Sequence, residues 1–141
     1  MKINPNLFSK MKFNDVFVVD DDKIYHFLIK KLLACNNIDV NPLFFENGLL
    51  AIEGIKTKID NRESLPDLIL LDINMPILDG WQFLEEFRLL KDKIEKEIII
   101  YIISSSDNTV DKDKAKEFKE EVKDYYLKPV TVDALKAIFS I

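Results

Sequence analysis

The sequence predicts an open parallel α/β sheet with helices on both of its faces. Short apolar runs alternate with amphipathic segments five times along the 141 residues, which is the pattern of repeated β–α units. Two of the runs, LILLD at 68–72 up to its final aspartate and IIIYII at 98–103, are apolar on both faces, as expected of central strands that helices cover on both sides. No repeat, low-complexity segment or break in composition divides the chain. We therefore expect one domain over 13–141, after a polar lead-in at 1–12 and with no output domain behind it.

The first two β–α units occupy residues 13–59. The first strand is FNDVFVV at 13–19, and the next helix has one apolar stripe at helical spacing, formed by Tyr25, Leu28, Ile29 and Leu32. A short second strand at 40–45 contains Pro42. Because proline has no N–H to donate to a neighbouring strand, we expect this strand at an edge of the sheet. Asn47 and Gly48 then turn the chain into a second helix at 49–59.

The remaining three units follow a polar loop at 60–67. The third strand leads through NMPILDG to a helix at 81–91, and the fourth strand ends in SSSDNT. A heavily charged fourth helix follows, whose buried side is predicted to consist of Ala115, Phe118 and Val122. The fifth strand is DYYL at 124–127, and VTVDALKAIFSI at 130–141 is the last helix.

Composition argues against several classes of protein. The net charge of −5 disfavours direct binding of nucleic acid, which calls for a basic face or stripe. The single cysteine rules out an internal disulfide or a thiolate metal cluster. No stretch is apolar over the thickness of a bilayer, and the first residues lack the apolar segment of a secretory signal. We interpret the chain as a cytoplasmic domain without membrane contact.

Polar side chains collect where four of the strands end. They belong to Asp20, Asp21, Asp22, Asp72, Asn74, Ser104, Ser105, Ser106 and Lys128. Ligands of open parallel sheets bind outside the carboxyl ends of the strands, so we expect these groups to converge. Carboxylate oxygens favour a hard cation such as Mg²⁺. A cation, an ammonium group and a hydroxyl around one carboxylate are also suited to the transfer of a phosphoryl group.

Four motifs in this order resemble those of the receiver domains of two-component response regulators. They are VVDD after the first strand, LLDINMPILDG around the end of the third, IIS at the fourth and YYLKP at the fifth. Each motif is weak alone, but their order and spacing on five β–α units are highly specific, and the resemblance covers 13–141. It implies a flavodoxin-like, doubly wound sheet with strand order 2-1-3-4-5 and five helices.

The resemblance also implies a role for each acidic residue of the site. Asp72 resembles the phosphoacceptor, whose carboxylate attacks phosphorus and forms an acyl phosphate. A Mg²⁺ ion would bind Asp21 and Asp72 directly and Asp20 through water. The backbone carbonyl of Asn74 would complete the protein ligands.

Three further residues carry implied roles in phosphoryl binding and switching. Lys128 would pair with the phosphoryl group, and the peptide bond from it to Pro129 is usually cis in this family. The hydroxyl of Ser104 would be drawn toward the phosphoryl group, and Tyr125 would turn inward with it. One departure is Glu121, which stands where the family usually has a helix-terminating glycine and leaves the geometry of that loop open.

The function that the resemblance implies is a stand-alone signalling switch, not an enzyme that turns over a separate substrate. Such a domain catalyses only its own phosphorylation and dephosphorylation. A sensor histidine kinase or a histidine phosphotransfer protein would supply the phosphoryl group to a monomer or weak dimer. The surface of the fourth helix, fifth strand and fifth helix would then contact a downstream protein.

Two other interpretations compete with this one. Asp20 and Asp22 formally satisfy the D-x-D motif of haloacid-dehalogenase-type phosphohydrolases, but Ile24 replaces their hydroxyl residue and no late acidic pair follows Lys128. Asp22 is instead typical of a helix N-cap. A degenerate receiver that only docks to partners would lack residues needed for chemistry, and none is missing. His26, the only histidine, is predicted to be structural or solvated rather than phosphorylated.

Overall fold

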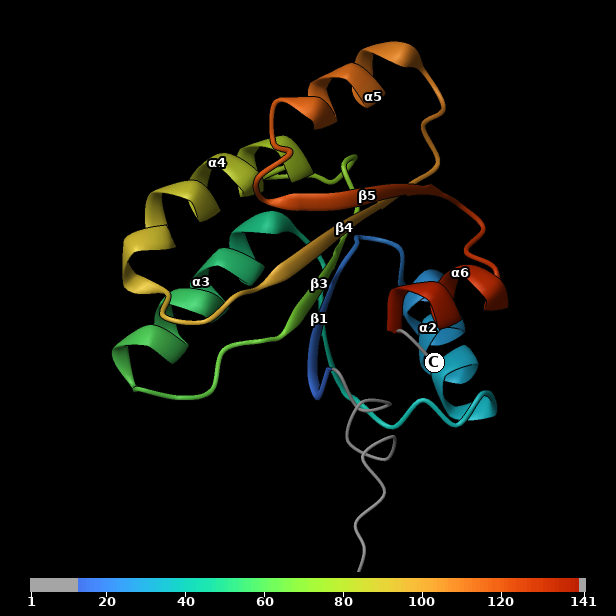
Figure 1. The fold of residues 1–141 in the computed structure, drawn as a ribbon, viewed down its shortest axis with the longest axis horizontal. Helices are drawn as coiled ribbons and strands as arrows, with labels where there is room; N and C mark the ends of the chain where they lie inside the picture. The colour runs from blue at the N-terminus through green and yellow to red at the C-terminus, as the bar shows by residue number, and fades with distance from the viewer. Residues whose placement is uncertain (1–12, 140–141) are drawn as a thin grey trace, which may run out of the picture.

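A computed structural model describes residues 13–139 (Figure 1), so the predicted lead-in at 1–12 and the end of the predicted last helix lie outside the described part. The elements are β1 (Asp15–Val19), α2 (Lys23–Cys35), β2 (Asn41–Phe45), α3 (Gly48–Asp60), β3 (Leu68–Leu71), α4 (Gly80–Leu90), η1 (Lys91–Lys93), β4 (Ile99–Ser104), α5 (Thr109–Lys116), β5 (Val122–Leu127) and α6 (Val132–Phe139). All strand pairs are parallel, in the order β2-β1-β3-β4-β5. The predicted doubly wound sheet with five α-helices is confirmed, and η1 is a short 3₁₀ turn between α4 and β4.

Helices cover both faces of the sheet, as Figure 1 shows, with α2 and α6 on one side and α3, α4 and α5 on the other. The two faces follow from the alternation of side chains along each strand. In β1, Phe17 and Val19 join the core with α3 and α4, whereas Val16 and Val18 join the core with α2 and α6. Every residue of β3 is buried, which confirms a central strand without a solvent face.

The proline of the second strand lies at an edge of the sheet, as predicted. Pro42 pairs with Val16 of β1, and β2 has no partner on its other side within the described residues. Its five residues are half-buried or exposed. An edge position needs no N–H donor on the free side, so the proline disrupts no ladder there.

The predicted buried side of the fourth helix is wrong at Val122, which is the first residue of β5 and pairs with Ile100. The helix α5 ends at Lys116, and Phe118 then reaches the core from a series of turns. The amide N–H of Val122 still bonds to the carbonyl of Phe118 at 2.8 Å. Spacings of three and four residues suit a helix face, but a turn followed by a strand produces the same spacing here.

The stripe predicted for the first helix is confirmed at Tyr25 and Ile29, holds in part at Leu32, and is wrong at Leu28. Leu28 is 39% exposed, and the buried residues of α2 are Tyr25, Ile29 and Leu33. These three are spaced by four residues and face the sheet. Among residues 13–139, no helix is long and apolar enough to cross a bilayer.

Candidate functional site at the carboxyl edge of the sheet

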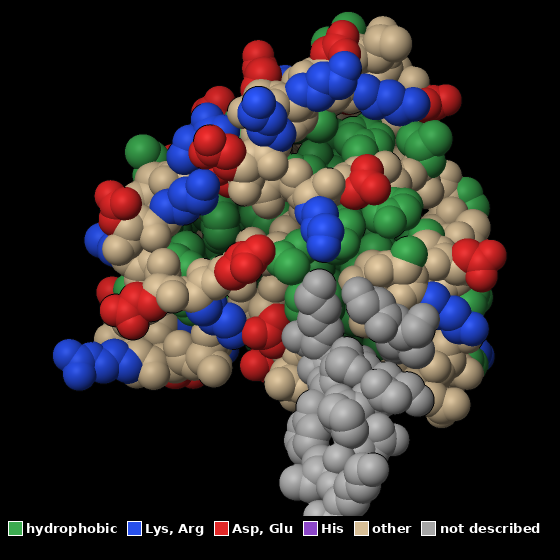
Figure 2. Space-filling model, viewed as in Figure 1, with side chains coloured by type: hydrophobic (Ala, Val, Ile, Leu, Met, Phe, Trp, Pro, Cys, Tyr) green, Lys and Arg blue, Asp and Glu red, His purple; other side chains and the backbone are tan. Residues whose placement is uncertain are grey.

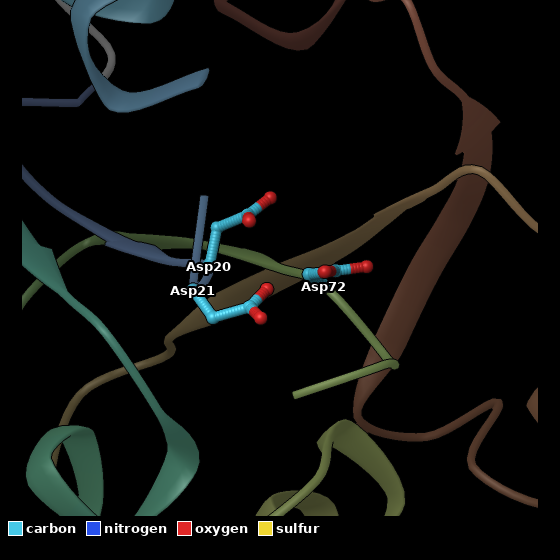
Figure 3. Close-up of side chains that lie close together, drawn as sticks. All are labelled: Asp20, Asp21 and Asp72. Atoms are coloured by element: carbon cyan, nitrogen blue, oxygen red, sulfur yellow. The ribbon is translucent and has the colours of Figure 1, made fainter. Parts of the chain in front are cut away.

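Three carboxylates meet where β1 and β3 end. Asp20 and Asp21 follow β1, Asp72 follows β3, and one carboxylate oxygen from each lies within 4.8 Å of the others. Figure 3 shows the three side chains extending to the same side of the sheet edge. Asp20 and Asp72 are buried, whereas Asp21 is exposed. The cluster therefore opens to solvent through Asp21, which leaves a path for a hydrated cation.

Backbone contacts hold Asp20 in place from several sides. Its N–H donates to the carbonyl of Phe45 at 2.9 Å, and its Oδ1 accepts the N–H of Asp22 at 2.9 Å. His26 Nε2 donates to the carbonyl oxygen of Asp20 at 2.6 Å, and the imidazole packs on the ring of Phe44 at 5.0 Å between centroids. His26 thus has the structural position that the sequence predicted, beside the site rather than in it.

Lys128 is the positive charge that balances the buried carboxylates. Its Nζ donates to Asp20 Oδ2 at 2.6 Å and lies 3.6 Å from Asp72 Oδ2. The backbone N–H of Lys128 bonds to the carbonyl of Ser104 at 2.9 Å, which ties the end of β5 to the end of β4. The Lys128–Pro129 peptide bond is cis, as the resemblance implied. The lysine and the two carboxylates come from residues far apart in the chain, and the sheet brings them together.

Electrostatic strain is concentrated on Asp72. Burial raises the pKa of Asp72 to about 6, and the nearby charge of Asp20 adds to the shift. Lys128 and the backbone N–H groups of Ile73 and Asn74 oppose it, and the N–H of Ile73 donates to Asp72 Oδ1 at 2.8 Å. The lysine therefore compensates only part of the negative charge. This all-oxygen donor set suits a hard cation such as Mg²⁺.

The start of α4 presses against the backbone of Asp72. A Cβ on Gly80 would lie 2.5 Å from the carbonyl oxygen of Asp72 and 2.7 Å from the Cα of Ile73, so only glycine fits at this position. Asp79 caps the helix, and Gln82 completes a capping box with it. The glycine of the LLDINMPILDG motif is thus needed for close approach between the helix and the site.

The two predicted switch residues are connected through a third residue. Ser104 is fully buried at the end of β4, and its Oγ accepts the N–H of Ser106 at 3.1 Å. The hydroxyl of Tyr125, on β5, donates to the carbonyl of Ser106 at 2.7 Å. Ser106 also donates its hydroxyl to Asp111 Oδ2 of α5 at 2.5 Å. The backbone of Ser106 therefore links the buried hydroxyl to the aromatic side chain.

Asp22 does not join the acidic cluster. Its Oδ1 accepts the N–H groups of Ile24 at 2.9 Å and Tyr25 at 3.3 Å, so it caps α2 as predicted. Asn74 is exposed in the loop after Asp72. Asp22 would be the second carboxylate of a D-x-D phosphohydrolase motif. Because its side chain caps α2, it is not directed at the site.

Comparison with known proteins decides the family. The family model for the response regulator receiver domain matches residues 16–140. The chain belongs to the response regulator receiver domains. Receiver domains are signalling switches rather than classical enzymes, and their partners are histidine kinases and phosphotransfer proteins.

The similar proteins differ in length, and this chain matches nearly the whole of some and only a part of others. It is 31% identical over 124 residues to the chemotaxis protein CheY of Bacillus subtilis, covering 87% of this chain and 92% of that protein. It is 32% identical over 126 residues to the transcriptional regulatory protein ZraR of Klebsiella oxytoca, covering 89% of this chain. There the receiver domain spans only 25% of the relative's length.

Solved structures share the same fold. A two-component response regulator from Cytophaga hutchinsonii has a TM-score of 0.75 and 28% identity, covering 92% of this chain and 96% of that one. The Mn²⁺-bound form of response regulator Rcp1 has a TM-score of 0.70 and 27% identity, covering 91% of each chain. The receiver fold predicted from the sequence is therefore confirmed at the level of topology and of family.

Two residues of this site were given no individual role by the sequence reasoning. Tyr25 packs against Lys128, with the lysine Nζ 4.4 Å from the centroid of the ring. Ser106 connects Ser104 to Tyr125. The apolar stripe assigned Tyr25 to the core, and Ser106 was one of three adjacent serines. Nothing in the sequence pattern distinguished either residue.

Proposed function

We propose that this receiver domain accepts a phosphoryl group on Asp72. The observation that carries the proposal is the placement of the buried Asp72 beside Lys128 and two further carboxylates at the strand ends. The donor phosphohistidine would come from a sensor histidine kinase or a histidine phosphotransfer protein. The Asp72 carboxylate attacks phosphorus, a P–O bond forms, the P–N bond to the donor breaks, and its electron pair stays on the imidazole.

Mg²⁺ would be the cofactor of this reaction. Asp21 and Asp72 would hold it directly, Asp20 would hold it through water, and Asn74 would contribute its backbone carbonyl. A bound Mg²⁺ supplies positive charge to the phosphoryl oxygens during the transfer. Support comes from the three clustered carboxylates and from the Mn²⁺-bound form of the similar Rcp1 structure. Lys128 supplies the second positive charge, and it leaves Asp20 to pair with the phosphoryl group.

The switch acts through Ser104 and Tyr125. The phosphoryl group draws the Ser104 hydroxyl away from the N–H of Ser106, and the bond from Tyr125 to Ser106 transmits the change to the surface. Phosphorylation of this kind biases an existing two-state equilibrium and creates no new fold. The surface that changes consists of α5, β5 and α6. These are the elements that the sequence analysis called the fourth helix, the fifth strand and the fifth helix.

The proposed output surface mixes charge with exposed apolar residues. Figure 2 shows acidic and basic side chains interspersed over α5 and the neighbouring part of α4. Val110 on α5 is 73% exposed and Leu127 on β5 is 40% exposed. This composition suits contact with a downstream protein rather than with nucleic acid. We expect the domain to act in the cytoplasm as a monomer or weak dimer.

The test is phosphorylation with acetyl phosphate in Mg²⁺, followed by intact-protein mass spectrometry and by hydroxylamine treatment. The wild-type protein should gain one phosphoryl group that hydroxylamine removes, and Asp72→Asn should gain none. Asp22→Asn makes the same charge change two residues from Asp20 but keeps a good helix cap, so it should still be phosphorylated. An undiminished adduct on Asp72→Asn would exclude Asp72 as the acceptor. Failure of the wild-type protein to bind Mg²⁺ would favour a docking-only receiver instead.

A further inference from the structure

Tyr25 packs its ring against the ammonium group of Lys128. It lies in α2, is 7% exposed, and its ring centroid is 4.4 Å from Lys128 Nζ. The ammonium group thus lies close to both the aromatic ring and the carboxylates of Asp20 and Asp72. Cation–π attraction is strongest where the cation is shielded from water, and the Lys128 side chain is only 19% exposed. The ring therefore fixes where the charge of Lys128 lies.

The hydroxyl group of Tyr25 has no hydrogen-bond partner. Over residues 13–139 it is the only buried side-chain nitrogen or oxygen atom in this condition. A buried hydroxyl without a partner destabilises the folded protein, and native structures contain few such groups. Phenylalanine would fill the same space beside Ile29 without this cost. The hydroxyl therefore calls for an explanation other than packing.

The charges around this hydroxyl keep it protonated. Burial raises the pKa of Tyr25, and the charges of Asp20 and then Asp72 raise it further. The phenol is therefore protonated at neutral pH and can donate a hydrogen bond. In the unphosphorylated protein this donor has no acceptor.

We propose that Tyr25 is a further residue of the phosphorylation site, which positions Lys128 through its ring and donates its hydroxyl to a phosphoryl oxygen on Asp72. This inference rests on the proposed function. Lys128 is the residue expected to pair with the phosphoryl group, and Tyr25 is packed directly on its charged end, so both donors would lie beside the same oxygens. In the free protein the hydroxyl is unpaired, and the phosphoryl group supplies the missing acceptor.

The experiment compares wild type, Tyr25→Phe and Tyr25→Leu in two measurements. The first is the midpoint of thermal unfolding (Tm) without ligand. The second is the affinity for beryllofluoride, a phosphoryl mimic, in saturating Mg²⁺, measured by calorimetry beside the affinity for Mg²⁺ alone. Tyr126→Phe removes a hydroxyl from a half-buried tyrosine outside the site and is the matched control.

Tyr25→Phe should have an equal or higher Tm than wild type and roughly 10-fold weaker beryllofluoride binding, with unchanged binding of Mg²⁺ alone. Tyr25→Leu should bind beryllofluoride more weakly still, because it also loses the aromatic face. A lower Tm for Tyr25→Phe would show that the hydroxyl has a structural partner and would overturn the inference. Equal beryllofluoride binding by Tyr25→Phe and wild type would also overturn it.

Two further outcomes separate this inference from its premise. Weaker binding of Mg²⁺ alone by Tyr25→Phe would place the hydroxyl on the metal's water shell and contradict the phosphoryl contact. If wild type binds no beryllofluoride and accepts no phosphoryl group, the proposed function fails together with the inference. If wild type is phosphorylated and Tyr25→Phe behaves identically, only the role of Tyr25 fails.

Discussion

At the scale of the residue, Asp72 combines burial with incomplete charge compensation. Its carboxylate is 6% exposed, with Asp20 close by and Lys128 shared between the two. A carboxylate in this position destabilises the metal-free protein, because its pKa is raised to about 6. The same excess of negative charge is what attracts a divalent cation.

Asp72→Asn should stabilise the metal-free protein at neutral pH. Because the pKa of Asp72 is higher in the folded than in the unfolded state, the folded protein binds more protons between about pH 4 and 6, and stability falls as pH rises through this range. We expect the substitution to raise the free energy of unfolding by about 2 kcal/mol at pH 7, and the gain to vanish near pH 4. Urea unfolding in EDTA at both pH values measures it, with Asp22→Asn as a control within about 0.5 kcal/mol of wild type. A gain that persists at pH 4 would contradict the electrostatic cause.

Sequence reasoning named the charged residues of the site but not their neighbours. Asp20, Asp21, Asp72 and Lys128 could be predicted because strand ends and motif order mark them. Tyr25 could not, because an aromatic residue at helical spacing is equally suited to the core, and only the fold places Lys128 against its ring. The roles assigned to the predicted residues remain predictions until phosphorylation is measured.

At the scale of the element, the loop between β3 and α4 contains a strained residue. Ile77 has φ of 72° and is 73% exposed. A positive φ is costly for L-residues and most of all for β-branched ones, and here the N–H of Leu78 closes a tight γ-turn around Ile77 by donating to the carbonyl of Pro76 at 2.8 Å. Ile77→Asn should therefore raise the free energy of unfolding by about 1 kcal/mol, since asparagine adopts a positive φ more readily than a β-branched residue. Ile24→Asn replaces an isoleucine that is 80% exposed on α2 and is the control, so an equal gain there would point to lost apolar exposure instead.

Glu121 joins the end of α4 to the turn before β5. Its side chain is fully buried and accepts from Arg88 at 2.6 Å and from Lys91 at 2.6 Å. Burial raises the pKa of Glu121, but the hydrogen bonds and charges of Lys91 and Arg88 outweigh it, and the net pKa is lowered. Glu121, which replaces the family's usual glycine, therefore has a structural role here. The sequence alone could not show this role, because Arg88 and Lys91 lie far from Glu121 in the chain.

Glu121→Gln should destabilise the domain more at neutral pH than at acidic pH. A lowered pKa in the folded state contributes stability above the unfolded pKa, and that contribution is lost as pH falls through the folded value. We expect a loss of about 1 kcal/mol at pH 7, since both cations are partly exposed to solvent, and a smaller loss near pH 3.5. Chemical denaturation at the two pH values measures it, and Glu120→Gln, at the neighbouring exposed glutamate, should change little. A loss that is equal at both pH values would rule out the charge as the cause.

The element boundaries show where periodicity stops being informative. The central strands and the edge strand were predicted correctly. A continuously apolar run indicates a strand buried on both faces, and a proline within a strand indicates an edge position. Val122 was assigned to a helix because its spacing from Phe118 suits one. Pairing with Ile100 in β4 places it in β5 instead, and contacts between distant strands are not visible in a local pattern.

At the scale of the whole molecule, the acidic edge couples cation binding to folding. Asp20, Asp21 and Asp72 come from two strands, and the unfolded chain does not hold them together, so a cation that needs all of them binds the folded state alone. Mg²⁺ at ten times its dissociation constant should then raise the free energy of unfolding by about 1.4 kcal/mol. Sodium chloride of equal ionic strength should not, because it screens the charges without bridging them.

The stabilisation by Mg²⁺ should depend on pH in the direction opposite to that of the metal-free protein. Near pH 5 a proton occupies Asp72, whose pKa is about 6, and competes with the cation. Thermal unfolding with and without MgCl₂ at pH 5 and pH 7 tests this, and the shift should be larger at pH 7. Asp21→Asn and Asp72→Asn should each reduce it, whereas Asp22→Asn should leave it intact because Asp22 caps α2. An equal shift with NaCl, or one that survives loss of Asp72, would mean that the cation binds elsewhere on this acidic chain.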